Sequence, residues 1–302
     1  MKHLLIIISF YLLFSSCQSQ EKNKTSEKKI KKEYYEYYSK PGLNAKIKRI
    51  EDLKFEESEE RQYNIYGNVI KKIYSSKIVA KYLYDGNQNL LREEIYDSEG
   101  GRINQKIYER NNKNKSLVTG QIHIRKKDTV SKDRNTYDKN DNLILEEWKT
   151  DSVWKKGFAY KYDEKGRKIL EYDYILEKYG GYPKVLYKYD EFDNLIITEQ
   201  LDSNNNVIRS TSYKYDERKN EIECITLSEP NKEIFREKFT TYDRFNNVTS
   251  LSYRNDKKEY EYKYKYNKHG DWIEKTLYSY GYFDKYVKRK IEYQTLPNKS
   301  YN

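Results

Sequence analysis

The sequence is poor in the residues on which most catalytic and metal sites depend. It has two cysteines, three histidines and one methionine in 302 residues. Cys17 and Cys224 are too few for a zinc site of Cys and His, and no GxSxG motif or phosphate-binding glycine loop is present. We therefore expect no enzyme, no cofactor and no bound metal ion.

Proline and glycine are also scarce, with 4 and 12 residues. All four prolines lie between the expected strands, because a proline cannot donate a hydrogen bond to a β-ladder. Without tyrosine, the apolar residues make up only roughly a quarter of the chain, which is little for a thick globular core. The abundant residues are tyrosine, with 35 copies, and charged residues, with 35%. This composition favours a sheet with one aromatic and one charged face.

The clearest local pattern is Tyr160–Tyr172, which reads YKYDEKGRKILEY. Tyr160 and Tyr162 alternate with a lysine and so share one face of a strand. Asp163 to Gly166 then has the chemistry of a type I turn, with Asp at the first position and Gly where φ is positive. The stretch therefore predicts a β-hairpin.

This unit recurs through the chain with a mean spacing of about 25 residues, as in a repeat architecture. The anchor tyrosines are Tyr63, Tyr84, Tyr108, Tyr137, Tyr162, Tyr189, Tyr215, Tyr242 and Tyr266. Gly67, Asn112, Asp141, Gly166, Asp193, Asn246 and Gly270 occupy the position expected to be left-handed. Gln88 and Lys219 are poor residues for it, so we expect those two turns to be longer or strained.

The repeated acidic residues are interpreted as turn residues. A carboxylate that begins every turn can accept hydrogen bonds from the following backbone. We assign this role to Asp163, Asp190, Asp216 and Asp243, with Gly166 and Gly270 in the left-handed positions. Asp190–Asp193 and Asp138–Asn142 lack the full ligand spacing of a calcium loop.

The fold class expected is all-β. Tandem hairpins of about 25 residues should form an elongated antiparallel sheet of about eighteen strands, with short connections. Such a sheet curls, so we expect a spiral or a partly closed, barrel-like shell, and the sequence does not decide whether it closes. The tyrosine face should be the concave or packed side. The other face should carry ladders of Lys and Glu, so the net charge of +11 is interpreted as a solvated face.

The N-terminus has the features of an export signal. A charged start is followed by the apolar run Leu4–Phe14 and by Ser15-Ser16-Cys17, which resembles a bacterial lipoprotein cleavage box. We predict a signal peptide over 1–17, lipidation of Cys17, a flexible tether over 18–41, capping strands over 42–60, the repeat domain over 61–293 and a loose tail over 294–302. An ordinary signal peptide, with Cys17 incidental, is the alternative.

Candidate binding residues are aromatic. Trp148 and Trp154 flank a long second turn predicted over Thr150–Gly157, and exposed aromatic rings can stack on sugars or peptides. We single out Trp148, Trp154, Trp272, Tyr160 and Tyr162, although each of them can equally be a packing residue. Any surface specific to function should lie where the repeat fails, over Asn111–Asp133 and Thr150–Gly157.

The repeat resembles the YD repeat of Rhs and related wall-associated proteins, in which Tyr-Asp is followed by two residues, Gly-Arg and an aliphatic pair. Tyr162–Arg167 matches this pattern, and the likeness covers roughly residues 60–293. The resemblance implies a β-shell. In the large relatives the shell surrounds a C-terminal toxin, for which this chain is too short. It looks closer to small repeat lipoproteins common in Bacteroidota.

From these observations we expect a non-catalytic lipoprotein of the cell envelope, in the outer membrane, that acts as a binding or structural scaffold. A glycan-binding surface module is one alternative. An immunity or accessory protein of a polymorphic toxin system is the other. The expected partners are the membrane, through the N-terminal lipid, and a glycan or a protein, and we expect no nucleic acid.

Overall fold

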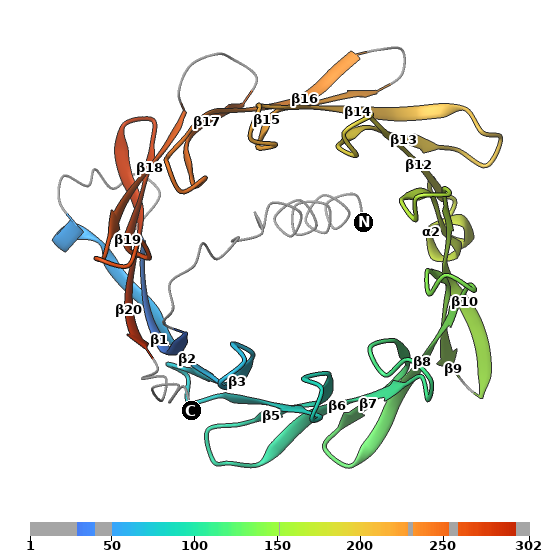
Figure 1. The fold of residues 1–302 in the computed structure, drawn as a ribbon, viewed down its shortest axis with the longest axis horizontal. Helices are drawn as coiled ribbons and strands as arrows, with labels where there is room; N and C mark the ends of the chain where they lie inside the picture. Colours follow the sequence, from blue (N-terminus) through green and yellow to red (C-terminus); the bar gives the residue numbers. More distant parts are fainter. Residues whose placement is uncertain (1–28, 40–49, 151, 229–231, 254–258, 294–302) are drawn as a thin grey trace, which may run out of the picture.

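The chain forms one antiparallel sheet of twenty strands that closes into a ring (Figure 1). The computed structural model describes residues 29–39, 50–150, 152–228, 232–253 and 259–293. Each strand from β2 to β20 pairs with its neighbours in the sequence, and β1 pairs with both β2 and β20. The structure confirms the all-β, antiparallel prediction and shows that the sheet closes completely.

The strands are short and follow one another with tight turns. They are β1 (Ile30–Ser39), β2 (Lys54–Tyr63), β3 (Val69–Tyr74), β4 (Val79–Tyr84), β5 (Leu90–Tyr96), β6 (Arg102–Arg110), β7 (Val118–Arg125), β8 (Asp128–Tyr137), β9 (Leu143–Thr150), β10 (Val153–Tyr162), β11 (Lys168–Asp173), β12 (Lys184–Tyr189), β13 (Leu195–Leu201), β14 (Val207–Tyr215), β15 (Glu221–Ser228), β16 (Lys232–Tyr242), β17 (Val248–Tyr253), β18 (Tyr260–Tyr266), β19 (Trp272–Ser279) and β20 (Tyr282–Tyr293). A 3-10 turn, η1 (Ile50–Asp52), precedes β2, and a short helix, α2 (Tyr174–Lys178), follows β11.

The first strand closes the ring. β1 lies inside the range 18–41, for which the sequence predicted a flexible tether, and that prediction is wrong for Ile30–Ser39. The reason is that this tyrosine-rich segment has residues that favour strands and pairs with β2 on one side and with β20 on the other. In the range 42–60, η1 and the beginning of β2 are described. Residues 1–28, with the predicted signal peptide and Cys17, residues 40–49 and residues 294–302 lie outside the described residues.

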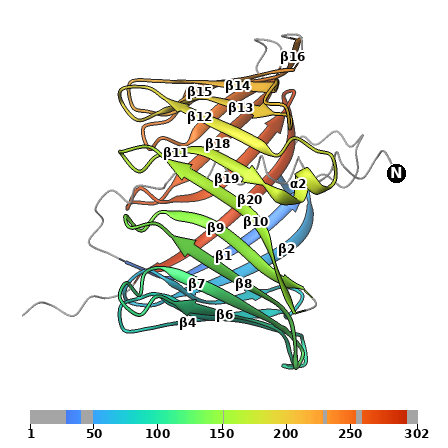
Figure 2. The same cartoon turned by 90° about the vertical axis from the view of Figure 1, so that its right-hand side faces the viewer.

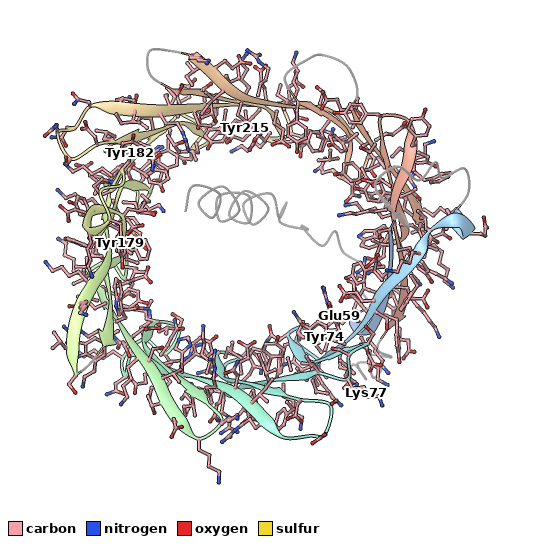
Figure 3. All side chains as sticks on the ribbon, turned by 180° about the vertical axis from the view of Figure 1, so that it is seen from behind. Glu59, Tyr74, Lys77, Tyr179, Tyr182 and Tyr215 are labelled. Atoms are coloured by element: carbon pink, nitrogen blue, oxygen red, sulfur yellow. The ribbon has the colours of Figure 1, made fainter. Side chains whose placement is uncertain are left out.

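The two faces of the sheet become the inner and outer walls of the barrel. Glu59 and Tyr74 are direct partners across β2 and β3, and both lie on the inner side of the ring (Figure 3). Direct cross-strand partners have side chains on the same wall, and side chains alternate between the walls along each strand. Each other residue can therefore be assigned to a wall by following the partners around the sheet from Glu59 and Tyr74. The inner wall carries most of the tyrosines. The prediction that the tyrosine face is concave is therefore consistent with the register.

The outer wall carries rows of cross-strand ion pairs. Examples that join neighbouring strands are Arg134–Glu147 at 2.6 Å, Lys188–Glu199 at 2.8 Å, Lys214–Glu223 at 2.7 Å and Lys265–Glu274 at 2.9 Å. Exposed pairs of this kind contribute little to stability, with a median of about 0–1 kcal/mol. Their consequence is a polar outer wall over most of the circumference.

Apolar packing is thin, as the composition predicts. The described part of the chain has one small cluster in which Leu53 and Tyr286 are buried, with Tyr38, Ile50 and Phe283 packed against them. It lies where η1 meets β1 and β20. No helix among the described residues is long and apolar enough to cross a membrane.

The turns at one end of the barrel share one design, which we call the Asp turn. In the first example, Asp163 Oδ1 accepts hydrogen bonds from the backbone N–H groups of Lys165 and Arg167, at 3.0 and 2.9 Å. The backbone N–H of Gly166 donates to the Asp163 carbonyl, and φ of Gly166 is +76°. The same side-chain bonds occur at Asp85, Asp138, Asp190, Asp216, Asp243, Asn64 and Asn267.

Gln88 and Lys219 adopt positive φ, at +66° and +64°, in turns of the same length as the others. The prediction of longer turns is therefore wrong. Their side chains contact the next turn, which explains why a residue other than glycine stands there. Gln88 Oε1 accepts a hydrogen bond from Asn64 Nδ2 at 2.8 Å, and Lys219 Nζ donates to the Phe192 backbone carbonyl at 3.1 Å.

The two segments interpreted as irregular are regular hairpins. β7 and β8 pair throughout most of Asn111–Asp133, and the predicted long turn over Thr150–Gly157 is short, because β9 ends at Thr150 and β10 begins at Val153. The anchor in the β6 repeat is Arg110, not Tyr108, because Asn111 begins the turn. Asn112 accordingly does not have positive φ.

The opposite end of the barrel is more varied. Hairpins such as β5–β6 and β13–β14 lean outward from the ring (Figure 1). Between β11 and β12 the hairpin turn is replaced by α2, which projects at this end (Figure 2). Asp173 caps α2, and the exposed side chains of Ile175, Leu176, Tyr179 and Tyr182 make this segment apolar.

Candidate ligand-binding wall inside the barrel

A barrel of twenty strands is too wide for its own side chains to fill, since a core packed by side chains alone is typical of about eight strands. The described side chains line the ring in Figure 3 and do not fill its centre. The inner wall is therefore the concave surface available to a ligand, and two groups of tyrosines recur on it.

The first class consists of the anchor tyrosines, which stand directly before the Asp turns. Tyr162 donates its hydroxyl hydrogen to the Leu143 carbonyl at 2.8 Å, where the β9–β10 ladder has ended. The same bond joins Tyr84 to Val69, Tyr137 to Val118, Tyr189 to Lys168, Tyr215 to Leu195 and Tyr242 to Glu221. Arg110 takes the place of the tyrosine in its repeat and donates to the Leu90 carbonyl at 2.5 Å. Tyr162 thus has a structural partner for its hydroxyl.

The second class of tyrosines pairs with carboxylates on the inner wall. Tyr160, two residues before its anchor, donates to Glu146 Oε1 at 2.5 Å, and Tyr187 donates to Glu171 Oε2 at 3.1 Å. Tyr253 is hydrogen-bonded to Glu237, and Tyr82 is the direct partner of Glu93. We call these four the tyrosine–carboxylate pairs. They place ring faces and hydrogen-bond acceptors together on several strands.

Between β10 and β12 the pairs form a compact aromatic platform. The rings of Phe158 and Tyr160 stack with centroids 6.5 Å apart and planes 14° from parallel. Lys168 Nζ lies 5.4 Å from the Tyr160 ring centroid and 4.5 Å from that of Tyr187, and it forms an ion pair with Glu171 at 2.6 Å. Flat rings flanked by a carboxylate and an ammonium group offer both stacking and hydrogen bonding to a ligand.

Burial changes the ionisation of groups on this wall. Burial, together with the hydrogen bond to Glu146, raises the pKa of the Tyr160 hydroxyl, so it stays protonated. Burial and the nearby charge of Glu237 raise the pKa of Glu221 to about 7, and burial also raises the pKa of Glu237. Burial alone lowers the pKa of Lys275, whose Nζ lies 4.7 Å from the Tyr262 ring centroid.

The aromatic residues singled out in the sequence do not form one site. Trp148 is on the inner wall, opposite Asp133, and its ring covers Gly157, where an added Cβ would lie 2.4 Å from a ring carbon. Trp154 is on the outer wall, opposite Lys149, with the Arg134 guanidinium 4.4 Å from its ring centroid. The two tryptophans are therefore on opposite faces of the same hairpin.

Trp272 begins β19 and contacts the closing seam, by which we mean β20, β1 and β2. The Arg289 guanidinium lies 4.9 Å from its ring centroid and forms a buried ion pair with Glu33. Glu33 is 2% exposed and also accepts hydrogen bonds from Tyr35 and Tyr63. Burial by itself would raise the pKa of Glu33, but the charge of Arg289 and the hydrogen bonds from Tyr63, Arg289 and Tyr35 lower it. Sequence reasoning missed this network, for which the alternation of Glu and Tyr over 33–37 was the available signal.

The remaining reactive residues lie apart from one another. His123 Nε2 lies 3.0 Å from Asp133 Oδ2 between β7 and β8, and Cys224 is a buried cysteine on β15. Across the described ranges, no three His, Cys, Asp or Glu side chains are grouped so as to hold a metal ion. The chemistry that the inner wall supports is thus binding by stacking and hydrogen bonding.

No protein-family model matches the chain, and no curated protein does. Among solved structures, it is similar to the toxin chains in the crystal structure of TcdB2-TccC3-TEV (TM-score 0.39, 13% identity, 76% of this chain and 15% of that chain) and in the Photorhabdus luminescens Tc holotoxin pore (TM-score 0.37, 13% identity, 78% and 16%). It is also similar to a porin-like protein from Bacteroides uniformis (TM-score 0.36, 10% identity, 87% and 98%). This chain spans about 15% of the first toxin chain, and we draw no functional argument from these similarities.

Proposed function

We propose that the protein is a non-catalytic, lipid-anchored scaffold of the cell envelope whose barrel binds a ligand along its inner wall. The observation that carries this proposal is the row of tyrosine–carboxylate pairs on the concave face of a barrel too wide to fill itself. A purely structural role would need the anchor tyrosines but not a second class whose hydroxyls are used by carboxylates.

The two walls and the N-terminal sequence support anchoring from one side of a membrane. The outer wall carries charged pairs such as Lys188–Glu199 and Lys265–Glu274, and such a surface suits water, because charges in hydrocarbon are costly. Lipid on Cys17, as the sequence predicts, would tether the barrel without embedding it. We infer also that the Tyr-Asp hairpins belong to the YD-repeat family.

A glycan is the ligand class favoured by one specific feature, the Phe158–Tyr160 platform. Stacked rings match the C–H face of a sugar, while Glu146 and Glu171 can accept hydrogen bonds from its hydroxyl groups. A peptide is the second candidate, since the same rings and carboxylates suit its basic and aromatic side chains.

The experiment that tests the proposal is binding to glycan and peptide arrays by three forms of the chain. The wild type is compared with Phe158→Ala/Tyr160→Ala on the inner wall and with Trp154→Ala on the outer wall of the same strand. We expect the inner-wall variant to lose binding by about ten-fold or more, as for a stacked aromatic anchor. Equal binding by all three forms, or no binding to either array, would contradict an interior binding site.

The anchoring part of the proposal has its own test. We expect Cys17→Ser to remove the chain from the membrane fraction of the producing cells, because lipidation of that thiol is the only anchor the sequence predicts. Cell fractionation with lipid labelling measures this. Lipid-labelled protein that stays with membranes in the Cys17→Ser variant would show that another residue is the anchor point.

A further inference from the structure

A second cavity, on the outer wall, has the chemistry of an anion site. It has a volume of about 290 Å³ and lies on β2–β5, where Gln62, Lys71, Lys81, Leu83, Arg92 and Glu94 line it. Glu59 is on the inner wall, so Gln62, three residues later on β2, is on the outer one. Lys71 is the direct partner of Gln62, and Lys81 is the direct partner of Lys71.

Two cations therefore face each other across β3 and β4. Like charges directly opposite one another in an antiparallel pair are destabilising. On its other side Lys81 is the direct partner of Glu94 on β5, but no ion pair joins the two, unlike Lys188 and Glu199 elsewhere on this wall. Neither Lys71 nor Lys81 has an ion pair with any residue that the structure describes. Lys81 Nζ lies instead over the Tyr96 ring, 4.5 Å from its centroid.

Arg92 adds a third cation, which forms an ion pair with Glu94. Its Nε lies 3.3 Å from Glu94 Oε1 but without the geometry of a hydrogen bond. Over the described ranges, Arg92 Nε is the single buried side-chain nitrogen or oxygen with no hydrogen-bond partner. An orphaned guanidinium N–H is costly in a folded protein, since buried polar atoms almost always have partners.

Glu94 does not neutralise these three cations. Its carboxylate accepts hydrogen bonds from the Tyr96 hydroxyl at 2.8 Å, from Gln105 Nε2 at 3.2 Å and from Arg102 at 3.3 Å. One negative charge is thus shared with a fourth cation, Arg102, and the cavity keeps an excess of positive charge. Exposed Leu83 and Ile70 give the cavity an apolar edge.

We propose that this cavity binds a phosphate group, through the Arg92 guanidinium and the Lys71 and Lys81 ammonium groups. A guanidinium and two ammonium groups match the charge and the acceptor oxygens of a tetrahedral oxyanion. The apolar edge accommodates the carbon portion to which a phosphate monoester or diester is attached. The group can come from a soluble phosphate compound or from a lipid headgroup. The site is independent of the inner wall.

The test uses the full-length Cys17→Ser protein, so that lipid attached to the chain does not contribute. Inorganic phosphate is titrated by calorimetry into this protein and into versions that carry in addition Arg92→Gln, Lys71→Glu or Lys161→Gln. Lys161 is an exposed outer-wall lysine on β10 and gives the matched loss of one positive charge. We expect Arg92→Gln to weaken phosphate binding at least about ten-fold, as for lost hydrogen bonds to a charged group, and Lys161→Gln to leave it unchanged.

Lys71→Glu separates a lost site from a misfolded one. It places a carboxylate opposite Lys81, so we expect this variant to abolish phosphate binding while its melting temperature is equal to or above that of the parent.

A second arm measures sedimentation with vesicles of phosphatidylcholine alone or mixed with phosphatidylglycerol. If the protein sediments with the mixed vesicles, and if this depends on Arg92 and is competed by inorganic phosphate, the phosphate belongs to a lipid headgroup. If the protein binds free phosphate but does not sediment with vesicles, the phosphate belongs to a soluble compound. No binding in either arm, or equal loss in Arg92→Gln and Lys161→Gln, overturns the proposal.

Discussion

The closing seam and the repeated wall hold the same sheet together by different means. In the wall, most repeats use the same two devices, an Asp turn and an anchor tyrosine, both within about 25 residues of their partners. In the seam, Glu33 meets Arg289 from 256 residues away, and neither residue has a counterpart in the repeat. The wall can therefore be extended by copying a unit, whereas closure needs residues that occur once.

The difference also concerns burial. The Asp turns and the ion pairs of the outer wall are exposed or half-buried, so each contributes modestly. Glu33 and Arg289 are 2% and 7% exposed, so separating them leaves a charge without a partner in a dry environment. We expect a mutation at the seam to cost more than one in any single repeat.

The largest expected effect is at Arg289. Arg289→Met should lower the free energy of unfolding by about 3–5 kcal/mol, because it leaves the buried Glu33 carboxylate unpaired. Urea denaturation measures it. The control on the same strand is Lys288→Met, whose ammonium lies 3.9 Å from Glu36 on the exposed side. If the double variant Glu33→Met/Arg289→Met regains all or part of the lost free energy of unfolding, the loss is due to the unpaired charge of Glu33. If Arg289→Met and Lys288→Met lower the free energy of unfolding equally, the seam has no special role.

In the repeated wall, the Asp turn should matter next. Asp216 accepts hydrogen bonds from the backbone N–H groups of Arg218 and Asn220, at 2.9 and 2.8 Å. Asp216→Ala should cost about 1–3 kcal/mol, since hydrogen bonds to a charged acceptor are lost. Glu217→Ala, at the exposed tip of the same turn, should cost almost nothing. If both variants melt at the same temperature, the carboxylate does not hold the turn.

The anchor tyrosine should have a smaller effect. Tyr162→Phe removes only the hydroxyl that binds the Leu143 carbonyl, so we expect a loss of about 0.5–1.5 kcal/mol. The matched control is Tyr66→Phe, at an exposed turn. Thermal unfolding of both variants measures the difference, and indistinguishable curves would mean that the bond to the carbonyl does not stabilise the fold.

A further effect expected in the wall is a pH dependence from Glu221. Burial and the neighbouring Glu237 raise its pKa from 4.5 to about 7 in the fold. In the unfolded chain the Glu221 carboxyl releases its proton above about pH 4.5, whereas in the folded chain it keeps the proton until about pH 7. The ionisation of Glu221 therefore lowers the free energy of unfolding as pH rises between these values. Glu221→Gln should therefore gain stability relative to the wild type from pH 5 to pH 8, as measured by urea unfolding. The exposed Glu217→Gln should show no such trend, and parallel profiles for Glu221→Gln and the wild type would exclude the raised pKa.

Local chemistry made much of the wall predictable. Asp163, Gly166 and the alternation around Tyr160 were sufficient for the hairpin, its turn and the faces of its strands, because all three depend on neighbours in the sequence. The binding residues were less accessible. Trp148 and Trp154 lie on opposite walls since β10 starts at Val153, and the register that decides this is a property of the paired strands. The side-chain contacts that accompany the positive φ of Gln88 and Lys219 were not predictable, because their partners lie on the neighbouring turn.

By itself the sequence determined that this chain is a tandem array of β-hairpins with one tyrosine-rich and one charged face. Turn chemistry and a period of two residues act over a few residues, and both are visible in the chain. Only the tertiary structure decided that the array closes, that β1 is the closing strand and that Tyr160 and Tyr187 face carboxylates across the inner wall. Those contacts join strands through the curvature of the whole sheet, and no local pattern encodes that curvature.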